Sequence, residues 1–348
     1  MKLLLKNSKN RIVLLSPFTI PEVIELVICA GGKPLFLDHE EGSTNISIKD
    51  LKKKIKLTPN SLILTHYNVN QKNYKDISSI CRQNKVFLIE DCAISIKGSS
   101  QNTFIGSLSE FSIYSFSSFK FINYFLGGCI SYKKKYEKTI NKETQDWKQL
   151  KAKDYFSKFV QTFKFSILTN KYFFNFFTFR LLKYLSNNKK NFLDKKSYLK
   201  ENFVLDKSYF SLPSNSAIYE IFQKVQQYKL NKAHRQKIVK VYFKYLHSIT
   251  IPKNNDKKNF FKNNDFIHYL VSCKNKNHKY FIKKKLLNLG FDVGGFFYPN
   301  CSQFKKFSRY GKIKSVDTLI NNLITLPTHL GINEKYAKKL SKKILEIY

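Results

Sequence analysis

The feature that most constrains this chain is a regular alternation of short apolar runs and amphipathic stretches through its first hundred or so residues. The apolar runs are bounded by polar or turn-forming residues, as buried strands are. In order along the chain they are Arg11–Leu15, Leu35–Asp38, Ser61–His66 and Lys85–Ile89. Strands that alternate with helices form βαβ units, so the pattern predicts an α/β fold with a mostly parallel sheet flanked by helices.

The amphipathic stretches predict the helices. Those between the first strands cover Glu22–Ala30, which ends at Gly31-Gly32, Ile48–Ile55 and Tyr74–Asn84. Later in the chain we expect a long helix over Ala217–Leu246, a strand over Phe266–Val271, and helices over Tyr280–Leu289 and Glu334–Tyr348. This second group predicts a smaller α+β domain at the C-terminal end.

Composition places the chain among globular proteins. Its 348 residues are 43% hydrophobic, which is enough for one large and one smaller domain. No apolar run approaches the roughly twenty residues of a membrane span, and the apolar core of Met1–Lys6 is too short for a secretory signal. The six cysteines are scattered without a CxxC pair, which favours reduced core residues of a cytoplasmic protein over a metal site or a disulfide framework.

The formal net charge of +38 attracts phosphate groups whatever else the protein does. The lysines are spread from end to end among many Asn, Ile and Phe residues, as in a general compositional bias, so specific nucleic-acid binding is not expected. A positive field equally suits a nucleotide-diphosphate sugar or an anionic membrane surface.

Lys120 is the first candidate for chemistry. It ends the hydroxyl-rich apolar run Tyr114–Phe119 and is followed by Gly127-Gly128. An amine among apolar side chains loses hydration, which lowers its pKa toward the range in which the neutral amine is a nucleophile. Most lysines in such a basic chain are solvated surface charges, so Lys120 alone identifies no site.

Asp91 gives Lys120 a chemical partner. It follows the predicted strand Lys85–Ile89, and ligands of open α/β sheets bind beyond the carboxyl ends of strands. An aspartate there can hold the protonated ring nitrogen of pyridoxal phosphate while a lysine forms the Schiff base to its aldehyde. Without the lysine, a helix cap would be the simpler interpretation of Asp91. His66, at another strand end, either faces this site or caps a turn, and the turn is favoured.

Four stretches then resemble the DegT/DnrJ/EryC1/StrS sugar aminotransferases, a family of fold-type I enzymes that use pyridoxal phosphate. They stand in the family's order and at similar spacing over nearly the whole chain, apart from a middle segment. They are Ser16-Pro17-Phe18-Thr19 leading to Ala30–Asp38, then Ile89-Glu90-Asp91-Cys92-Ala93, then Gly106-Ser107-Leu108 leading to Ser115–Lys120, and finally Leu326–Gly331.

The resemblance implies a sugar aminotransferase that acts as a homodimer with shared sites. In such an enzyme Lys120 would bind pyridoxal 5'-phosphate and carry the proton in each half of the reaction, and Asp91 would keep the ring nitrogen protonated. Ser115 matches a serine that contacts the cofactor phosphate, and Ile20 stands where an aromatic residue usually stacks on the ring. The donor would be an amino acid such as glutamate, and the acceptor a nucleotide-linked keto-sugar in polysaccharide biosynthesis.

The sequence also departs from the family at the supports of the cofactor. Ile94 replaces the usual Gln or His, Phe297 replaces a His before Tyr-Pro, and Tyr209–Leu212 replaces a segment that supplies Asn and Arg across the dimer. The Gly/Ser/Thr-rich phosphate-binding turn that precedes Arg11 in the family is not in the sequence, so we expect a shortened cofactor domain. The alternative is therefore a non-catalytic relative that acts as a binding or membrane-associated partner.

The segment 154–185 differs from the rest of the chain, because aromatic residues alternate there with Lys and Arg. A basic, aromatic, helical stretch of this length is typical of an interfacial helix on an anionic membrane. The alternative is an inserted helical pair that packs against the body of the protein or across a dimer interface. We accordingly expect a cofactor-binding domain over 1–140, an insert over 141–212, and a long helix with a small domain over 213–348.

Overall fold

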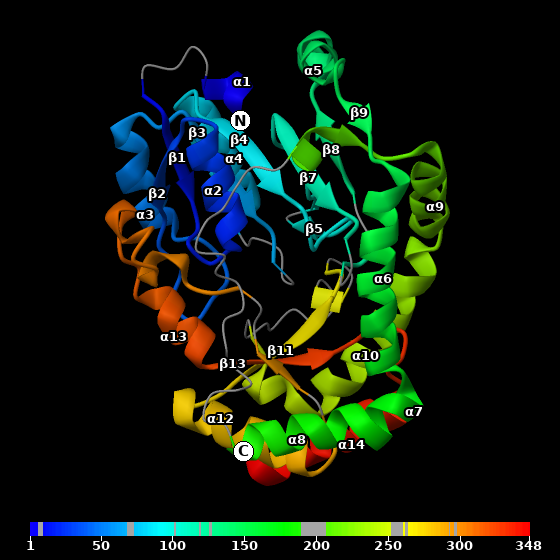
Figure 1. Ribbon diagram of the computed structural model, residues 1–348. Coiled ribbons are helices and arrows are strands. Elements are labelled where there is room, and N and C mark those ends of the chain that lie inside the picture. Colours follow the sequence, from blue (N-terminus) through cyan, green and yellow to red (C-terminus); the bar gives the residue numbers. More distant parts are fainter. Residues whose placement is uncertain are drawn as a thin grey trace.

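The structure is a computed structural model that describes residues 1–5, 10–67, 73–100, 102–117, 120–124, 127–188, 207–251, 260–261, 264–291, 293–295 and 298–348. Figure 1 shows a blue-to-cyan part built around a sheet, a yellow-to-red part at the opposite end, and green helices that run along one side of both. The predicted Phe297 and most of the predicted loop after Leu185 lie outside the described residues.

The larger sheet has the strand order β2-β1-β3-β4-β7-β8. All neighbouring pairs are parallel except β7 and β8, which are antiparallel. The strands are β1 Ile12–Leu15, β2 Lys33–Phe36, β3 Ser61–Thr65, β4 Phe87–Asp91, β7 Phe111–Ser115 and β8 Gly128–Tyr132. The predicted α/β class with a mostly parallel sheet is therefore confirmed.

Burial on both faces explains why these strands are continuous apolar runs rather than alternating ones. All of β3 is buried, as are Val13, Leu14 and Leu15 of β1. Helices α2 Pro21–Cys29, α3 Ile48–Lys54 and α4 Tyr74–Gln83 connect the strands. Leu51 of α3 and Ile77 of α4 pack in one core cluster with Leu14 and Leu62 of the sheet.

The predicted C-terminal α+β unit is a second, antiparallel sheet with the order β11-β13-β12. Its strands are β11 His268–Ser272, β12 Gly294–Gly295 and β13 Leu323–Pro327. Helices α10 Tyr228–Leu246, α12 Lys276–Asn288 and α14 Glu334–Ile347 bury their apolar faces against it in one cluster. A further cluster joins both parts of the molecule, because Ile267 and Phe307 pack with Phe18 and Ile89.

The green helices are α6 Ala152–Thr169, α7 Lys171–Phe173, a π-helical turn Phe174–Thr178, and α8 Phe179–Asn188. The aromatic segment is thus helical, as predicted. Its helix extends past the expected end at Leu185, so the predicted loop begins later than we proposed. Within the described residues, no helix has the length and apolarity that crossing a membrane requires.

The single long helix predicted over 217–246 is two helices, α9 Asn215–Gln226 and α10. At Gln227 between them the backbone has φ −79° and ψ 0°, so the helical turn is interrupted. The remaining elements are short: α1 Lys2–Leu5, β5 Ser99–Ser100, β6 Thr103–Phe104, α5 Glu137–Thr144, β9 Lys148–Gln149, β10 Ser211–Leu212 and α13 Ser315–Asn321. The proposed division of the chain at 140 and 212 stays a prediction.

Candidate active site

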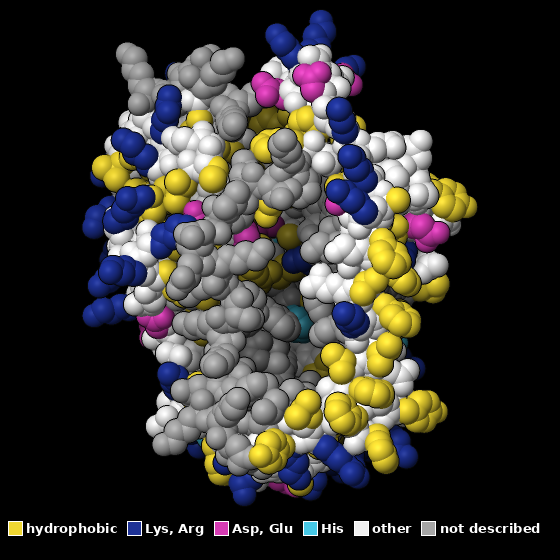
Figure 2. All heavy atoms as spheres, in the orientation of Figure 1, with side chains coloured by type: hydrophobic (Ala, Val, Ile, Leu, Met, Phe, Trp, Pro, Cys, Tyr) yellow, Lys and Arg dark blue, Asp and Glu magenta, His cyan; other side chains and the backbone are white. Residues whose placement is uncertain are grey.

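The parallel strands bring Asp91 and Lys120 to the same edge of the sheet. Asp91 is the last residue of β4, and Lys120 lies in the connection that leaves the carboxyl end of the neighbouring strand β7. Figure 2 shows a hollow in this face of the molecule, in which Lys or Arg and His side chains are visible. The predicted position of the site, beyond the carboxyl ends of parallel strands, agrees with this arrangement.

Asp91 is held in one orientation by two donors. The backbone N–H of Ala93 donates to its Oδ1 at 3.1 Å, and the hydroxyl of Thr65 donates to its Oδ2 at 3.4 Å. Burial raises the pKa of Asp91, while the Ala93 N–H and the charge of Lys120 partly offset that rise. Asp91 is thus an oriented carboxylate that a nearby cation helps to keep charged.

Lys120 is a half-buried amine. Burial lowers its pKa, and the carboxylate of Asp91 opposes that effect. The predicted desolvation of this lysine is therefore present in the structure, although its neighbours Ser118 and Phe119 lie outside the described residues. The mutual effect of the two groups on pKa shows that the amine and the carboxylate lie within electrostatic reach of each other.

Ser115 and Ile20 occupy the margins of this region. Ser115 is the half-buried last residue of β7, with its Oγ 3.2 Å from the Oγ of Ser117. Ile20 is half-buried at the start of α2, in extended backbone ahead of Pro21. Ser115 ends β7 and Ile20 follows β1 in the chain. Both residues are therefore at the edge of the sheet that carries Asp91.

The C-terminal part adds residues that the sequence did not single out. His268, the first residue of β11, has its pKa lowered to about 4 by burial and by the charges of Arg235, His329 and Lys120. The pKa of His329 is also lowered, by burial and by Arg235. His268 is therefore neutral near pH 7, and the lowered pKa of His329 also favours its neutral form, so Arg235 on α10 is the cation that this group adds beside Lys120.

Arg235 organises this group from α10. Its Nη1 donates to Thr328 Oγ1 at 3.0 Å and to the carbonyl of Ile267 at 3.2 Å, and its Nε donates to Asn231 Oδ1 at 2.9 Å. Its guanidinium also lies 5.0 Å from the ring centroid of Phe121, the residue after Lys120. Arg235 thus fastens the end of β13 to the segment that carries Lys120.

Three more contacts hold that segment. Asn231 Nδ2 donates to the carbonyl of Phe121 at 3.0 Å, and the ring of Tyr228 lies 5.0 Å from that of Phe121. Lys224 Nζ donates to the carbonyl of Asn123 at 2.7 Å. We call these three residues, with Arg235, the clamp; together they fix the backbone that follows Lys120.

Asp265 fixes the segment that follows Asp91 in the same way. Its buried carboxylate accepts hydrogen bonds from the N–H groups of Ile96 at 2.8 Å and Lys97 at 3.2 Å, and from the hydroxyl of Tyr228 at 2.5 Å. Lys232 Nζ lies 3.3 Å from the same carboxylate. The positions of both candidate site residues therefore depend on contacts with the C-terminal half of the chain.

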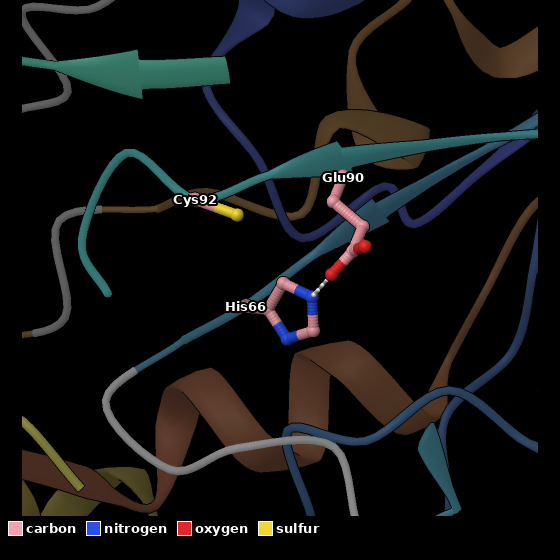
Figure 3. Close-up of side chains that lie close together, drawn as sticks. All are labelled: His66, Glu90 and Cys92. Carbon is pink, nitrogen blue, oxygen red and sulfur yellow. Dashed lines mark hydrogen bonds and ion pairs between the residues drawn. The ribbon is translucent and has the colours of Figure 1, made fainter. Parts of the chain in front are cut away.

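Behind Asp91 lies a buried cluster of His66, Glu90 and Cys92, which Figure 3 shows with the imidazole directed at the carboxylate. His66 Nε2 and Glu90 Oε2 are 2.7 Å apart, and both side chains are fully buried. The favoured prediction that His66 caps a turn is wrong, because its partner is a side chain on the neighbouring strand β4. Its Nδ1 has no hydrogen-bond partner among the described residues.

Three donors satisfy the carboxylate of Glu90 in this cluster. Besides His66, the hydroxyl of Tyr74 donates to Glu90 at 3.0 Å and the N–H of Gly106 donates at 2.8 Å. Gly106 has φ +88°, and a Cβ there would lie 2.1 Å from the hydroxyl of Tyr114, so this turn requires glycine. Burial raises the pKa of Glu90, but His66 and the Gly106 N–H outweigh it and leave the pKa below its ordinary value. We interpret the cluster as a support for β4.

The side chains at the sheet edge form a donor set that suits pyridoxal phosphate. The ring nitrogen of this cofactor needs an anionic acceptor, its aldehyde needs an amine, and its phosphate needs hydroxyl or amide donors. Asp91, Lys120 and Ser115 supply one group of each kind. The residues present therefore fit the cofactor that the sequence predicts.

Only some of these additional site residues could have been identified from the sequence. Thr328 and His329 belong to the Leu326–Gly331 stretch that was recognised by resemblance, but nothing in a helical pattern distinguishes Arg235 or Asn231 from other polar residues of α10. Asp265 precedes a predicted strand, as many turn residues do. Their roles depend on contacts between segments far apart in the sequence.

Comparison with known proteins shows which sequences this chain resembles. Residues 1–158 match the DegT/DnrJ/EryC1/StrS aminotransferase family. GDP-perosamine synthase of Vibrio cholerae is 25% identical over 118 residues, which are 34% of this chain and 32% of that protein. The dTDP-4-dehydro-2,3,6-trideoxy-D-glucose 4-aminotransferase of Saccharopolyspora spinosa is 24% identical over 110 residues, 32% of this chain and 29% of that protein. The matches span about a third of the length of these curated relatives.

Solved structures match over much more of the chain. An aminotransferase of this family from Brucella abortus has a TM-score of 0.68 at 18% identity, over 97% of this chain and 79% of its own. An aminotransferase from Helicobacter pylori involved in the biosynthesis of pseudoaminic acid has a TM-score of 0.71 at 14% identity, over 100% of this chain and 82% of its own. At these identities the likeness shows the fold. Residues 1–158, a little under half of the chain, thus resemble the DegT/DnrJ/EryC1/StrS aminotransferases in sequence, and the chain as a whole has the fold of these two solved aminotransferases.

Proposed function

We propose that this protein uses pyridoxal 5'-phosphate to transfer an amino group from an amino acid, with glutamate as the expected donor, to a keto-sugar linked to a nucleotide. The observation that carries the proposal is a half-buried amine, Lys120, within electrostatic reach of an oriented carboxylate, Asp91, at the carboxyl ends of neighbouring strands. The names of the relatives, which include a GDP-perosamine synthase, support this substrate class.

The two residues have separate tasks in this proposal. Asp91, held by Ala93 and Thr65, accepts a hydrogen bond from the ring nitrogen and stabilises positive charge there. Because burial lowers the pKa of Lys120, its amine loses its proton at a lower pH than a surface lysine does. The neutral amine can then attack a carbonyl carbon, and once released it can take up and return a proton.

When bound, the cofactor supplies an electron sink that permits removal of the proton from the amino-acid α-carbon. Ser115, at the end of β7, is placed to donate its hydroxyl hydrogen to a phosphate oxygen, and Ile20 provides an apolar surface against which a planar ring can pack. The net charge of +38 favours the approach of a nucleotide diphosphate.

We also propose a cytoplasmic homodimer. Ile218, Tyr219 and Phe222 form an exposed apolar face on α9, next to the clamp residue Lys224, and a second copy of this chain would cover it. Four of the six cysteines are buried thiols, which suits a reducing compartment. Light scattering on the purified protein tests the dimer, and a monomeric mass at micromolar concentration would contradict it.

The test of function is the visible absorbance of the protein after mixing with pyridoxal phosphate and dialysis. We expect a retained yellow band that borohydride bleaches, that Lys120→Ala lacks, and that Lys49→Ala, a substitution of an exposed lysine, retains. Asp91→Asn should keep a band but lose most of the amino transfer from glutamate, because a neutral amide stabilises ring charge poorly.

The alternative of a non-catalytic relative makes the opposite prediction. No retained band in the intact chain, at any pH at which the protein is folded, would favour that alternative. A retained band without conversion of nucleotide-linked keto-sugars would keep the cofactor assignment and overturn the substrate class.

A further inference from the structure

Helix α6 carries an apolar face that the rest of the described chain does not cover. Phe156, Phe159, Phe163 and Ile167 are spaced three, four and four residues apart, so they lie along one side of the helix. All four are exposed, Phe156 by 67%. The rings of Phe159 and Phe163 stack on each other at 5.9 Å, and the two side chains remain 45% and 54% exposed.

The same kind of face continues beyond α6. Tyr172, Phe176, Phe177, Leu181 and Tyr184, which lie in α7, the π-helical turn and α8, are exposed as well. Tyr172 is 79% exposed and Phe176 is 75% exposed. We call these residues, with those of α6, the aromatic stripe. Figure 2 shows hydrophobic side chains gathered along the right and lower right of the molecule, over α9, α6 and α7.

The segment is attached to the body at both ends, so its exposure is not that of a detached arm. The N–H of Ser214 donates to the hydroxyl of Tyr155 at 2.7 Å near the start of α6, and α8 packs against α12. Of the alternatives to a membrane helix, packing against the body does not describe the exposed side chains of the stripe, whereas packing across a dimer interface stays open. A large exposed apolar patch of this kind marks a surface for a partner.

The charges beside the stripe select the partner. Residues 151–188 contain seven Lys or Arg and one acidic residue, Asp154, for a net charge of +6. Lys153, Lys164 and Arg180 are exposed, and the Arg180 guanidinium lies 5.2 Å from the Phe176 ring centroid. Two copies joined symmetrically through this surface would bring like charges together, whereas an anionic lipid surface offers the opposite charge.

We propose that the aromatic stripe docks the protein on an anionic lipid bilayer, with α6 and α8 lying in the headgroup region. The aromatic rings would enter the boundary between headgroups and acyl chains, and the lysines and arginines beside them would contact lipid phosphates. The proposal does not depend on the proposed aminotransferase activity. It agrees with the finding that, in the described residues, no helix is suited to crossing the bilayer.

Flotation of the full-length protein with vesicles tests the proposal. The vesicles are phosphatidylcholine alone or phosphatidylcholine with about a quarter phosphatidylglycerol, at about 0.15 M and about 1 M salt. We expect flotation with the anionic vesicles that salt weakens without abolishing, because both charge and aromatic insertion contribute. The double variant Phe163→Ser/Phe176→Ser should fall at least tenfold in recovery. Phe104→Ser, which removes a 67% exposed ring outside these helices, should float like the unchanged chain.

Three results would overturn the proposal. The first is equal recovery of the unchanged protein with neutral and anionic vesicles, or recovery with neither. The second is flotation of the double variant as strong as that of the parent, which would leave only adsorption of a basic protein. The third is a dimer of the parent that light scattering shows the double variant to lose, which would assign the stripe to a second copy. An unchanged far-ultraviolet circular dichroism spectrum and melting temperature establish that the variants are folded.

Discussion

At the scale of single residues, hydrogen bonds fix the protonation state of His39. This buried imidazole lies 2.6 Å from the hydroxyl of Ser16 through Nε2 and 3.3 Å from the carbonyl of Ser43 through Nδ1. A carbonyl oxygen only accepts, so Nδ1 carries the hydrogen. In the neutral imidazole Nε2 is then an acceptor, and the Ser16 hydroxyl donates to it while its oxygen accepts from the N–H of Phe18. Burial accordingly lowers the pKa of His39 to about 4, although the Ser43 carbonyl and Asp38 favour the charged form.

This pKa predicts acid sensitivity. Between pH 6.5 and about 4 the unfolded chain binds a proton at His39 that the folded protein does not, so stability falls with falling pH over that window. The free energy of unfolding should lose about 3 kcal/mol across it from this residue. Melting temperatures of His39→Gln should depend less on pH there than those of the parent, and the substitution of exposed His247 by Gln should leave the dependence unchanged. Equal slopes for parent and His39→Gln would contradict the assignment.

At the scale of elements, α10 determines where the segment after β7 lies. Asn231, near the start of this helix, donates to the carbonyl of Phe121 and accepts from Arg235 Nε. Asn231 therefore links α10 and Arg235 to the backbone next to Lys120. If α10 were shifted by one turn along its axis, residues three or four positions away would take the places of Asn231 and Arg235, and these contacts would be lost.

Asn231→Ala should weaken cofactor retention more than it weakens the fold. Loss of its two hydrogen bonds costs about 2 kcal/mol in stability, but a displaced Lys120 also becomes more hydrated, which moves its pKa back up. We expect the absorbance band to appear at higher pH than in the parent and the dissociation constant for pyridoxal phosphate to rise severalfold. Asn288→Ala, at the exposed end of α12, is the control. A loss of melting temperature with an unshifted pH midpoint would show that Asn231 only supports the fold.

At the scale of the whole molecule, the two parts share one core and one buried acid. The core cluster that includes Phe18 and Ile89 from the first part includes Ile267 and Phe307 from the second. Asp265 then joins the segment after Asp91 to α10 through Ile96, Lys97 and Tyr228. Both site segments are therefore positioned from the C-terminal half, and the first part alone would not hold the site.

Asp265→Ala should accordingly affect both stability and the site. Removing this carboxylate leaves Lys232 and two backbone N–H groups without their acceptor, which costs about 3 to 5 kcal/mol in the free energy of unfolding. Urea denaturation measures that loss, and dialysis should show less retained cofactor under conditions where the variant is still folded. Asp76→Asn, on the exposed side of α4, should change neither. Full cofactor retention in folded Asp265→Ala would show that the site does not depend on the contacts of Asp265.

The sequence by itself determined the α/β class, the order of the strands along the chain and the pair Lys120 and Asp91. These follow from local patterns, because apolar runs, helical periodicity and a residue's place after a strand are all read within a few positions. Resemblance added Ser115 and Ile20. The roles of all four residues toward the cofactor remain predictions.

Only the tertiary structure decided what surrounds those residues. The pairing of His66 with Glu90, the clamp on Phe121 and the acceptor role of Asp265 join segments that lie 24, 110 and 169 residues apart, and no local pattern encodes such contacts. The same holds for the aromatic stripe, since its periodicity predicts a helix with an apolar face but not whether that face is covered. Local preferences fix the elements, whereas burial and partner choice depend on how the whole chain packs.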